Sequence, residues 1–306
     1  MLEGLRIIDL THRLPGPLAG KILADLGAEV IKVEDEKHKD PFLSGMFSDF
    51  DKSFESLYGE LNRRKRVLRF DFKAADARAR IHALVKSADG VLLSLSPKLK
   101  GSLGLSAEEL KGVGPIAVVE LEASSTHNKA MHDLNALAIS GFLSLHVSHE
   151  EGQIVAPPFL PVAGIAFGQQ VATQMLANII HAKKNNTFVN TVSYLHDTAE
   201  LILSPFWSED LRSQKKTKFL HNGAYPCYSL YRTLDGQYVA VAAVEDKFWT
   251  DLIATFGIGL PLERRFETKE DAFETVANVF AKLHADEIES KARDKELCIS
   301  IVRKIS

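Results

Sequence analysis

Cysteine is nearly absent from this 306-residue sequence, which contains only Cys227 and Cys298. Because the two cysteines lie far apart, they form neither a disulfide framework nor a metal-binding motif, and we expect no metal cofactor. An excess of one charge is also absent, since 37 basic and 40 acidic residues leave a net charge of −3. This balance gives no general attraction to nucleic acid or membranes, so a local basic patch must hold any anionic ligand.

Long uninterrupted hydrophobic runs are missing as well. The most apolar stretch, Ala163–Ala182, is interrupted by polar amides, at Gln169, Gln170, Gln174 and Asn178. These amides favour a packed core helix over a membrane span. The chain also enters its first strand directly, with no signal peptide, so we expect a cytoplasmic protein.

The first 34 residues predict a strand, a helix and a second strand. Leu5–Leu10 is a short apolar run, residues 18–26 repeat apolar side chains at helical spacing until Gly27, and Val30–Val33 is apolar again. The loop between the first strand and the helix contains neither the GxGxxG nor the Walker A pattern, so Gly16 and Gly20 are interpreted as turn and helix-packing glycines. Strands and helices continue to alternate up to residue 121, which predicts an α/β fold with a Rossmann-like, mostly parallel sheet.

A basic segment at residues 61–73 is the strongest local charge feature. Asn62, Arg63, Arg64, Lys65 and Arg66 precede an alternating strand at residues 67–72. One interpretation is a solvated basic turn before a strand. The alternative is that the turn holds the phosphates of a nucleotide-like ligand through charge-assisted hydrogen bonds.

The pattern changes after residue 205, which predicts a second domain. A charged, less periodic linker spans residues 206–222, and the segments 228–232 and 238–243 alternate as strands around the turn at residues 234–236. We therefore predict a large domain at residues 1–205, the linker, and a smaller α+β domain at residues 223–306.

Several of these segments together resemble the class III CoA-transferase family, which includes formyl-CoA transferase, the carnitine CoA-transferase group and 2-methylacyl-CoA racemase. The resemblance lies in the ordered elements D-L-T-H, G-P, A-D-L-G-A and V-I-K-V-E at residues 9–34, and in MHDLNALAISG at residues 131–141, which is closest to the racemase branch. It implies coenzyme A or an acyl-CoA as the small-molecule substrate and a homodimer as the assembly. Family members continue beyond the position of residue 306, so a C-terminal return segment is expected to be missing.

The resemblance also implies roles for individual residues. His132 corresponds to the histidine base of the racemases, with Asp133 beside it and Glu245 as its acidic partner. Without the family, a His-Asp pair at a helix start and an acidic residue after a strand are both interpreted as helix caps. The residues implied for coenzyme A binding are Leu14, Pro15, Asn62, Arg63, Lys65, Arg66, Phe70, Asp71, Phe72 and Lys73.

The sequence departs from the family pattern at the aspartate that is essential in the family. Its position is occupied by Ala163, and no carboxylate residue lies between Gly152 and His196. Acid also replaces the family's arginine-proline-glycine after the second strand, as Asp35-Glu36-Lys37, and Arg64 replaces a glycine. For a reaction that needs a second acid or base, His127 is a candidate.

These observations lead to two hypotheses about function. The first is a CoA-thioester-processing enzyme that resembles a 2-methylacyl-CoA racemase and uses His132 for α-proton transfer. The alternative is a catalytically inactive homologue that binds coenzyme A or serves as an assembly partner, because a covalent or acid/base role of the aspartate is unavailable to Ala163.

Overall fold

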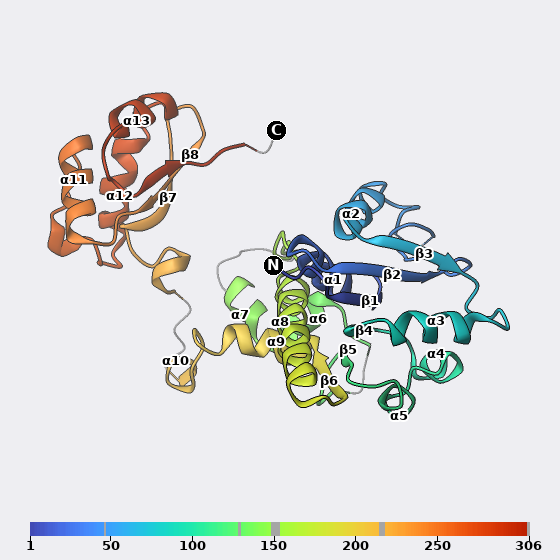
Figure 1. The fold of residues 1–306 in the computed structure, drawn as a ribbon. Coiled ribbons are helices and arrows are strands. Elements are labelled where there is room, and N and C mark those ends of the chain that lie inside the picture. Colours follow the sequence, from blue (N-terminus) through green and yellow to red (C-terminus); the bar gives the residue numbers. More distant parts are fainter. Residues whose placement is uncertain (46, 128–129, 148–153, 214–217, 305–306) are drawn as a thin grey trace. The chain divides into compact units, whose positions relative to one another are not determined.

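A parallel sheet covered by helices on both faces forms the N-terminal part of the chain (Figure 1). The computed structural model describes all residues except 46, 128–129, 148–153, 214–217 and 305–306. It divides the chain into two compact units, Met1–Ser208 and Glu209–Ser306. The strands of the first unit are β1 (Arg6–Leu10), β2 (Glu29–Asp35), β3 (Arg66–Phe70), β4 (Gly90–Leu93), β5 (Ala117–Glu122) and β6 (Val189–Tyr194).

The strand order is β3-β2-β1-β4-β5-β6, and every neighbouring pair in this sheet is parallel. This is the doubly wound order, in which the chain direction across the sheet reverses between β1 and β4. The predicted α/β class with a Rossmann-like sheet is therefore confirmed, and so is the smaller α+β part described below.

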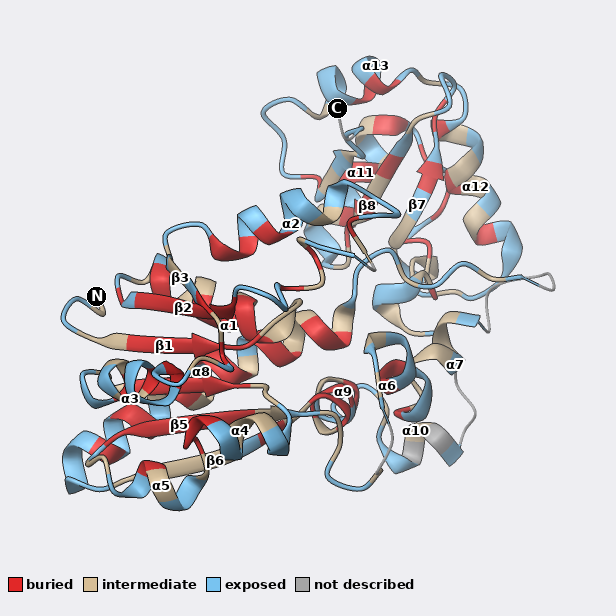
Figure 2. Ribbon diagram, turned by 90° about the vertical axis from the view of Figure 1, so that its right-hand side faces the viewer, coloured by how far each residue is buried: buried red, intermediate tan, exposed pale blue. Residues whose placement is uncertain are grey.

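Successive strand residues face opposite helical layers because side chains alternate along a strand. Ile7 of β1 belongs to one core cluster and Ile8 to the other. Figure 2 shows that the inner strands β2, β1, β4 and β5 are mostly buried, whereas the edge strands β3 and β6 are mostly not. One layer consists of α1 (Pro15–Asp25), α6 (Asp133–Ile139), α8 (Val162–Asn185) and α9 (Leu195–Leu203). The other layer consists of α3 (Ala77–Lys86), α4 (Pro97–Leu103) and α5 (Ala107–Lys111).

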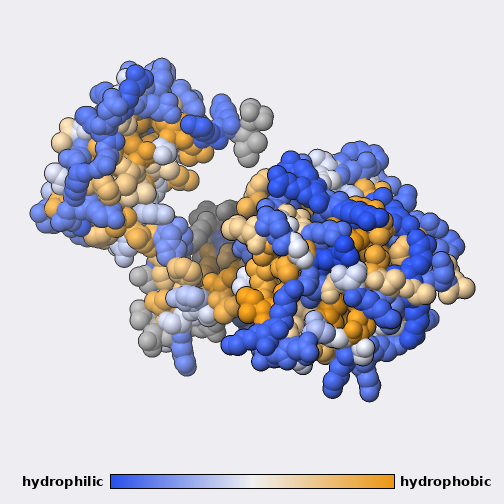
Figure 3. Space-filling view, viewed as in Figure 1, coloured by the Kyte–Doolittle hydropathy of each residue, from blue (hydrophilic) through white to orange (hydrophobic). Residues whose placement is uncertain are grey.

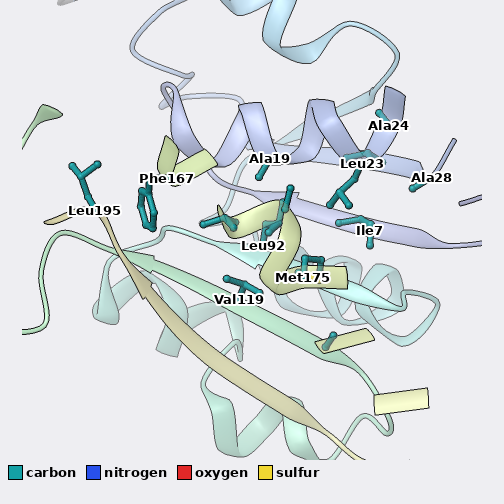
Figure 4. Close-up of a cluster of buried hydrophobic side chains, with 14 of the residues drawn as sticks. Ile7, Ala19, Leu23, Ala24, Ala28, Leu92, Val119, Phe167, Met175 and Leu195 are labelled. Atoms are coloured by element: carbon teal, nitrogen blue, oxygen red, sulfur yellow. The ribbon is translucent and has the colours of Figure 1, made fainter. Parts of the chain in front are cut away.

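The helix α8 is the central element of the first layer, as its apolar sequence predicts. Its Phe167 and Met175 lie among the buried side chains of α1 and the sheet (Figure 4). Gly90 allows this close approach, because a methyl group added there would come within 2.6 Å of the Met175 sulfur. In the described part of the chain, no helix combines the length and apolarity that a membrane span requires.

The second unit contains an antiparallel sheet of order β7-β8-β9. Its elements are β7 (Tyr228–Arg232), β8 (Tyr238–Ala242), α11 (Asp246–Phe256), α12 (Glu270–Phe280), α13 (Ala285–Ala292) and β9 (Ile299–Ile301). Trp249 and Phe280, both fully buried, join the helices to the inner face of this sheet. On the visible face of each unit, hydrophilic residues alternate with apolar patches (Figure 3).

Some helices were not expected from the sequence. From the sequence, residues 35–60 predict a loop with short helical pieces and residues 94–98 predict a turn. In the structure α2 (Ser53–Asn62) is a continuous helix, and α4 begins within the predicted turn. For α4 a local signal existed, since the Ser96 hydroxyl accepts a hydrogen bond from Leu99 N and Pro97 is the first helical residue. The remaining short elements are α7 (Phe142–Val147), α10 (Glu209–Ser213), and the 3₁₀ turns η1 (Leu220–Asn222) and η2 (Leu262–Arg264).

The turn between α2 and β3 gives a testable prediction at Arg64. Its φ of 67° lies in the left-handed region, which disfavours side chains with a Cβ atom. We expect Arg64→Gly to raise the free energy of unfolding by about 0.5–1 kcal/mol, because relief of this strain exceeds the entropy that glycine loses on folding. Urea denaturation measures the change. Arg63→Gly is the control and should destabilise, since Arg63 has an ordinary φ of −56°; a lower stability of Arg64→Gly would contradict the prediction.

Candidate active site

A cavity of about 390 Å³, which we call the strand-end pocket, opens at the carboxyl ends of β1, β2 and β4. Its lining includes His12, Asp35, Lys39, Phe72, Lys73 and Ser94. It lies where the strand order reverses between β1 and β4, which is where doubly wound sheets bind their ligands. The first unit therefore has a concave site at the position that its topology favours.

His12 and Ser94 connect the ends of the two central strands. The Ser94 hydroxyl lies 3.2 Å from His12 Nδ1, within hydrogen-bond distance. Burial of the imidazole, together with the positive charge of Arg13, lowers the pKa of His12. The ring is therefore neutral at pH 7 and serves as a polar, uncharged wall. Neither residue is among the site residues predicted from the sequence.

The acidic side chains of the pocket differ in their partners. Glu34 accepts hydrogen bonds from Tyr58 Oη at 2.9 Å and from Arg69 Nε at 2.9 Å. Asp40 accepts backbone hydrogen bonds from Arg13 N and Phe42 N. Asp35 accepts one from Lys37 N at 3.0 Å. All three carboxylates are buried, so the pocket has acidic groups in its interior.

The end of the predicted basic segment reaches this pocket. Phe72 is buried in its wall, and Lys73 is exposed at the same cavity. Phe70 packs against Phe72 with ring centroids 5.5 Å apart. Asp71 accepts hydrogen bonds from Lys37 Nζ at 2.5 Å and Lys73 N at 2.9 Å, which fixes the turn that positions Lys73.

Other residues of the basic segment lie beneath α1. The ammonium group of Lys65 is fully buried and donates to Asp9 Oδ2 at 2.9 Å, Pro17 O at 2.7 Å and Asn62 Oδ1 at 3.0 Å. Asp9, Lys32 and Lys65 together form what we call the buried ion cluster. Gly20 allows α1 to pass over it, since a methyl group there would come within 2.7 Å of Asp9 Oδ2. These contacts give Asn62 and Lys65 structural roles, and ligand binding by them stays a prediction.

The remaining predicted ligand residues are on the surface or in α1. Arg63 is exposed and pairs with Glu60 at 2.8 Å, and Arg66 is exposed at the start of β3. Leu14 is the N-cap residue of α1, and Pro15 is its first residue. Because the loop from Thr11 leads directly into Leu14, it joins the strand-end pocket to the start of α1.

The N-terminal ends of α6 and α8 meet beside Leu14. Asp133 Oδ1 accepts a hydrogen bond of 2.6 Å from Gly164 N. A methyl group added at Gly164 would approach Leu14 Cδ2 to 3.0 Å and Asp133 Oδ1 to 3.5 Å. Ala163 is completely buried at the same end of α8. The Asp133 carboxylate therefore lies at the end of α8 that contains Ala163, the residue predicted to occupy the position of the family's aspartate.

His132 and Asp133 occupy different environments at the start of α6. His132 is the N-cap residue, its backbone N donates to Asn135 Oδ1 at 3.0 Å, and its side chain is exposed. Burial raises the pKa of Asp133, although the backbone N–H groups of Gly164 and Ala163 act in the opposite direction. An exposed imidazole beside a half-buried carboxylate offers two titratable groups for proton transfer.

Two further candidates belong to other segments of the chain. His127 packs edge to face against His196, with ring centroids 4.9 Å apart, and lies 3.4 Å from the Ser124 hydroxyl. Glu245 is the exposed N-cap residue of α11 in the second unit, so its pairing with His132 stays a prediction. In the described part of the chain, no three His, Cys, Asp or Glu side chains are grouped as a metal site requires.

Comparison with known proteins identifies the family. The profile of CoA-transferase family III matches residues 2–306. The chain belongs to this family. Alpha-methylacyl-CoA racemase from Mus musculus is 28% identical over 302 residues, covering 92% of the chain and 72% of that protein. Succinate–glutarate CoA-transferase from Agrobacterium fabrum is 29% identical over 273 residues, covering 84% of the chain and 67% of that protein.

The fold of the family III chain also matches solved structures. The crystal structure of Rv3272 from Mycobacterium tuberculosis superimposes with a TM-score of 0.75 at 23% identity, covering 99% of the chain and 85% of that protein. A CAIB/BAIF family protein from Brucella suis gives a TM-score of 0.75 at 22% identity, covering 95% and 80%. The match to the family profile confirms the predicted family, so the candidate site is interpreted in terms of acyl-CoA substrates.

Proposed function

We propose that this family III chain binds a CoA thioester in the strand-end pocket and exchanges the proton α to the thioester carbonyl through His132. The supporting observation is the junction beside Leu14. There the Asp133 carboxylate accepts a hydrogen bond from the backbone N–H of Gly164, the residue that follows Ala163. One of the relatives is an alpha-methylacyl-CoA racemase, which favours α-proton transfer as the reaction class of this chain. Leu14 follows the loop that lines the pocket, so a bound thioester has a short path to this junction.

The proposed chemistry needs one positioned base and a stabilised enolate. His132 removes the α-proton, and the electron pair of the broken C–H bond moves into the enolate, whose oxygen accepts hydrogen bonds from backbone N–H groups. Asp133 is proposed to assist this proton transfer from the same junction. Glu245 is proposed to orient His132. The protonated imidazole of His132 exchanges its proton with solvent and returns a solvent-derived proton to the same face of the same carbon, which completes an exchange without a second base at Ala163.

A second candidate is coenzyme A binding without turnover. It is favoured by Ala163, because a buried methyl group provides neither the nucleophile of acyl transfer nor an acid for the opposite face of an enolate. In this case the chain acts as a binding or assembly protein, and the homodimer expected from the family is proposed as its form. Sedimentation of the purified chain measures that state.

Calorimetric titration and deuterium exchange separate the two candidates. Coenzyme A and a branched acyl-CoA are titrated into the protein, and the acyl-CoA is then incubated with it in deuterated water and followed by NMR. Binding with α-deuterium incorporation supports the proposed reaction. Binding without incorporation supports the second candidate, and no saturation at millimolar ligand contradicts both.

A lysine substitution tests the location of the ligand. We expect Lys73→Ala to weaken coenzyme A binding about five- to tenfold, because an exposed cation at the pocket attracts the phosphates only through partly screened charge. Lys86→Ala is the matched control, since Lys86 is exposed at the end of α3 and is outside the pocket lining. Equal affinities of the two variants would place the ligand elsewhere.

A further inference from the structure

The strand β2 ends in a carboxylate that faces the ligand site. Asp35 is its last residue, lines the strand-end pocket and is only 9% exposed. Its one hydrogen bond described above comes from Lys37 N, a backbone donor that leaves further lone pairs of the carboxylate available. Asp35 is therefore placed to accept hydrogen bonds from a ligand.

Among the described residues, Asp35 forms no ion pair with a lysine or arginine. Glu34 is paired with Arg69 at 2.9 Å and Lys32 at 4.0 Å, and Lys37 is paired with Asp71. Within the described residues, no lysine or arginine nitrogen lies within 4 Å of the Asp35 carboxylate. The cations of the pocket, Lys39 and Lys73, are exposed. The pocket thus has an unpaired anion in its interior and cations in contact with solvent.

This arrangement matches a known rule for doubly wound sheets. In the doubly wound sheets that bind dinucleotides, a carboxylate after the second strand accepts a hydrogen bond from a ribose hydroxyl, whereas an arginine nearby accommodates a phosphate on that ribose. We apply the same electrostatic principle to this pocket, although its first loop lacks the glycine-rich dinucleotide motif. A phosphate placed beside the buried, unpaired Asp35 would meet a like charge in a medium of reduced dielectric. The exposed lysines remain suitable for a diphosphate at the solvent side of the pocket.

We propose that the strand-end pocket selects an acyl carrier whose ribose hydroxyls are free, so that thioesters of dephospho-CoA bind in preference to those of coenzyme A. The inference rests on the proposed function, because it specifies which thioester the same pocket takes. Asp35 is the specificity residue: it accepts the ribose hydroxyl and repels the 3′-phosphate that distinguishes coenzyme A.

Calorimetric titration with dephospho-CoA and with coenzyme A tests the proposal, since the two ligands differ only in this phosphate. We expect dephospho-CoA to bind at least about tenfold more tightly, with a ratio that falls as salt screens the repulsion. In Asp35→Asn the ratio should approach one. This variant keeps an oxygen acceptor for Lys37 N and removes only the charge.

Glu36→Gln is the matched control, because it removes one charge at an exposed neighbour outside the pocket lining and should leave the ratio unchanged. Equal or tighter binding of coenzyme A to the unmodified protein overturns the inference and leaves the proposed function intact. Failure of both ligands to bind at millimolar concentration overturns the inference and the proposed function together.

Discussion

Asp9→Ala is expected to lower the free energy of unfolding by about 3–5 kcal/mol, because it leaves two buried cations without their shared anion. Asp9 has no exposed surface, and its carboxylate lies 2.9 Å from Lys65 Nζ and 3.8 Å from Lys32 Nζ. Since domains are typically stable by only about 5–15 kcal/mol, much of the fold's stability depends on this group. Urea denaturation of the purified variant measures the loss.

Two further variants separate the ion cluster from a general effect of charge. Asp25→Ala removes a carboxylate that is 40% exposed and pairs with Lys21, and its effect should stay within about 1 kcal/mol. The double variant Asp9→Ala/Lys65→Met should recover part of the loss, because one of the unpaired cations is removed with its partner. A double variant as unstable as the sum of its two single variants would contradict the explanation.

The same cluster predicts how stability depends on acid. Burial alone would raise the pKa of Asp9, but the ammonium groups of Lys32 and Lys65 and the Thr11 hydroxyl hold it below its usual value. A lowered native pKa means that Asp9 contributes its stabilisation in full above the unfolded pKa of about 3.9. That contribution is lost as the pH falls through the native pKa, so acid denaturation of Asp9→Asn should lack this part of the transition.

His132→Ala is expected to lower the rate of α-deuterium exchange by about 10²–10⁴-fold, the usual contribution of a general base. The imidazole is exposed at the N-cap of α6, so its removal should leave stability and coenzyme A affinity nearly unchanged. His181→Ala is the control, since it removes an exposed histidine from the C-terminal part of α8. Exchange that survives in His132→Ala would show that another group is the base.

The Ala163 position gives a stereochemical complement to this test. With one base, the unmodified protein should exchange the α-proton on one face and retain the configuration of the substrate. Ala163→Asp places a second carboxylate at the N-terminal end of α8 and should allow racemisation of the same thioester. Circular dichroism of the variant checks that the buried position accepts the larger side chain. Racemisation by the unmodified protein would contradict the one-base scheme.

The regular elements were largely predictable because their signals are local. The apolar run at Leu5–Leu10 and the helical repeat of Ala163–Ala182 each determine a buried element through their own side chains. The hairpin strands at 228–232 and 238–242 follow from alternation around a turn. α2 was not predicted as a continuous helix, although its apolar residues from Phe54 to Leu61 stand at helical spacing, because this repeat is short and contains Gly59, which disfavours a helix.

The candidate site was only partly predictable for a related physical reason. Lys65 and Lys73 belong to one basic segment and look equivalent in sequence, yet the turn at Arg64 sends Lys65 beneath α1 and β3 leads Lys73 to the pocket. Asp133 could be interpreted only as a cap or an acid until its partner was known, and that partner, Gly164, is 31 residues away. Long-range contacts of this kind leave no signal within a window of the sequence.

The sequence by itself determined the family and the α/β class, because these depend on which residues occur and in what order. That Ala163 occupies the position of the family's aspartate stays a prediction. The tertiary structure decided which charges are buried and which face a ligand. Asp9 and Asp35 both occur in strands of the first βαβ unit, but one is enclosed by two lysines and the other lines a cavity. The free energy of a charge depends on its solvent and partners, which only the folded chain defines.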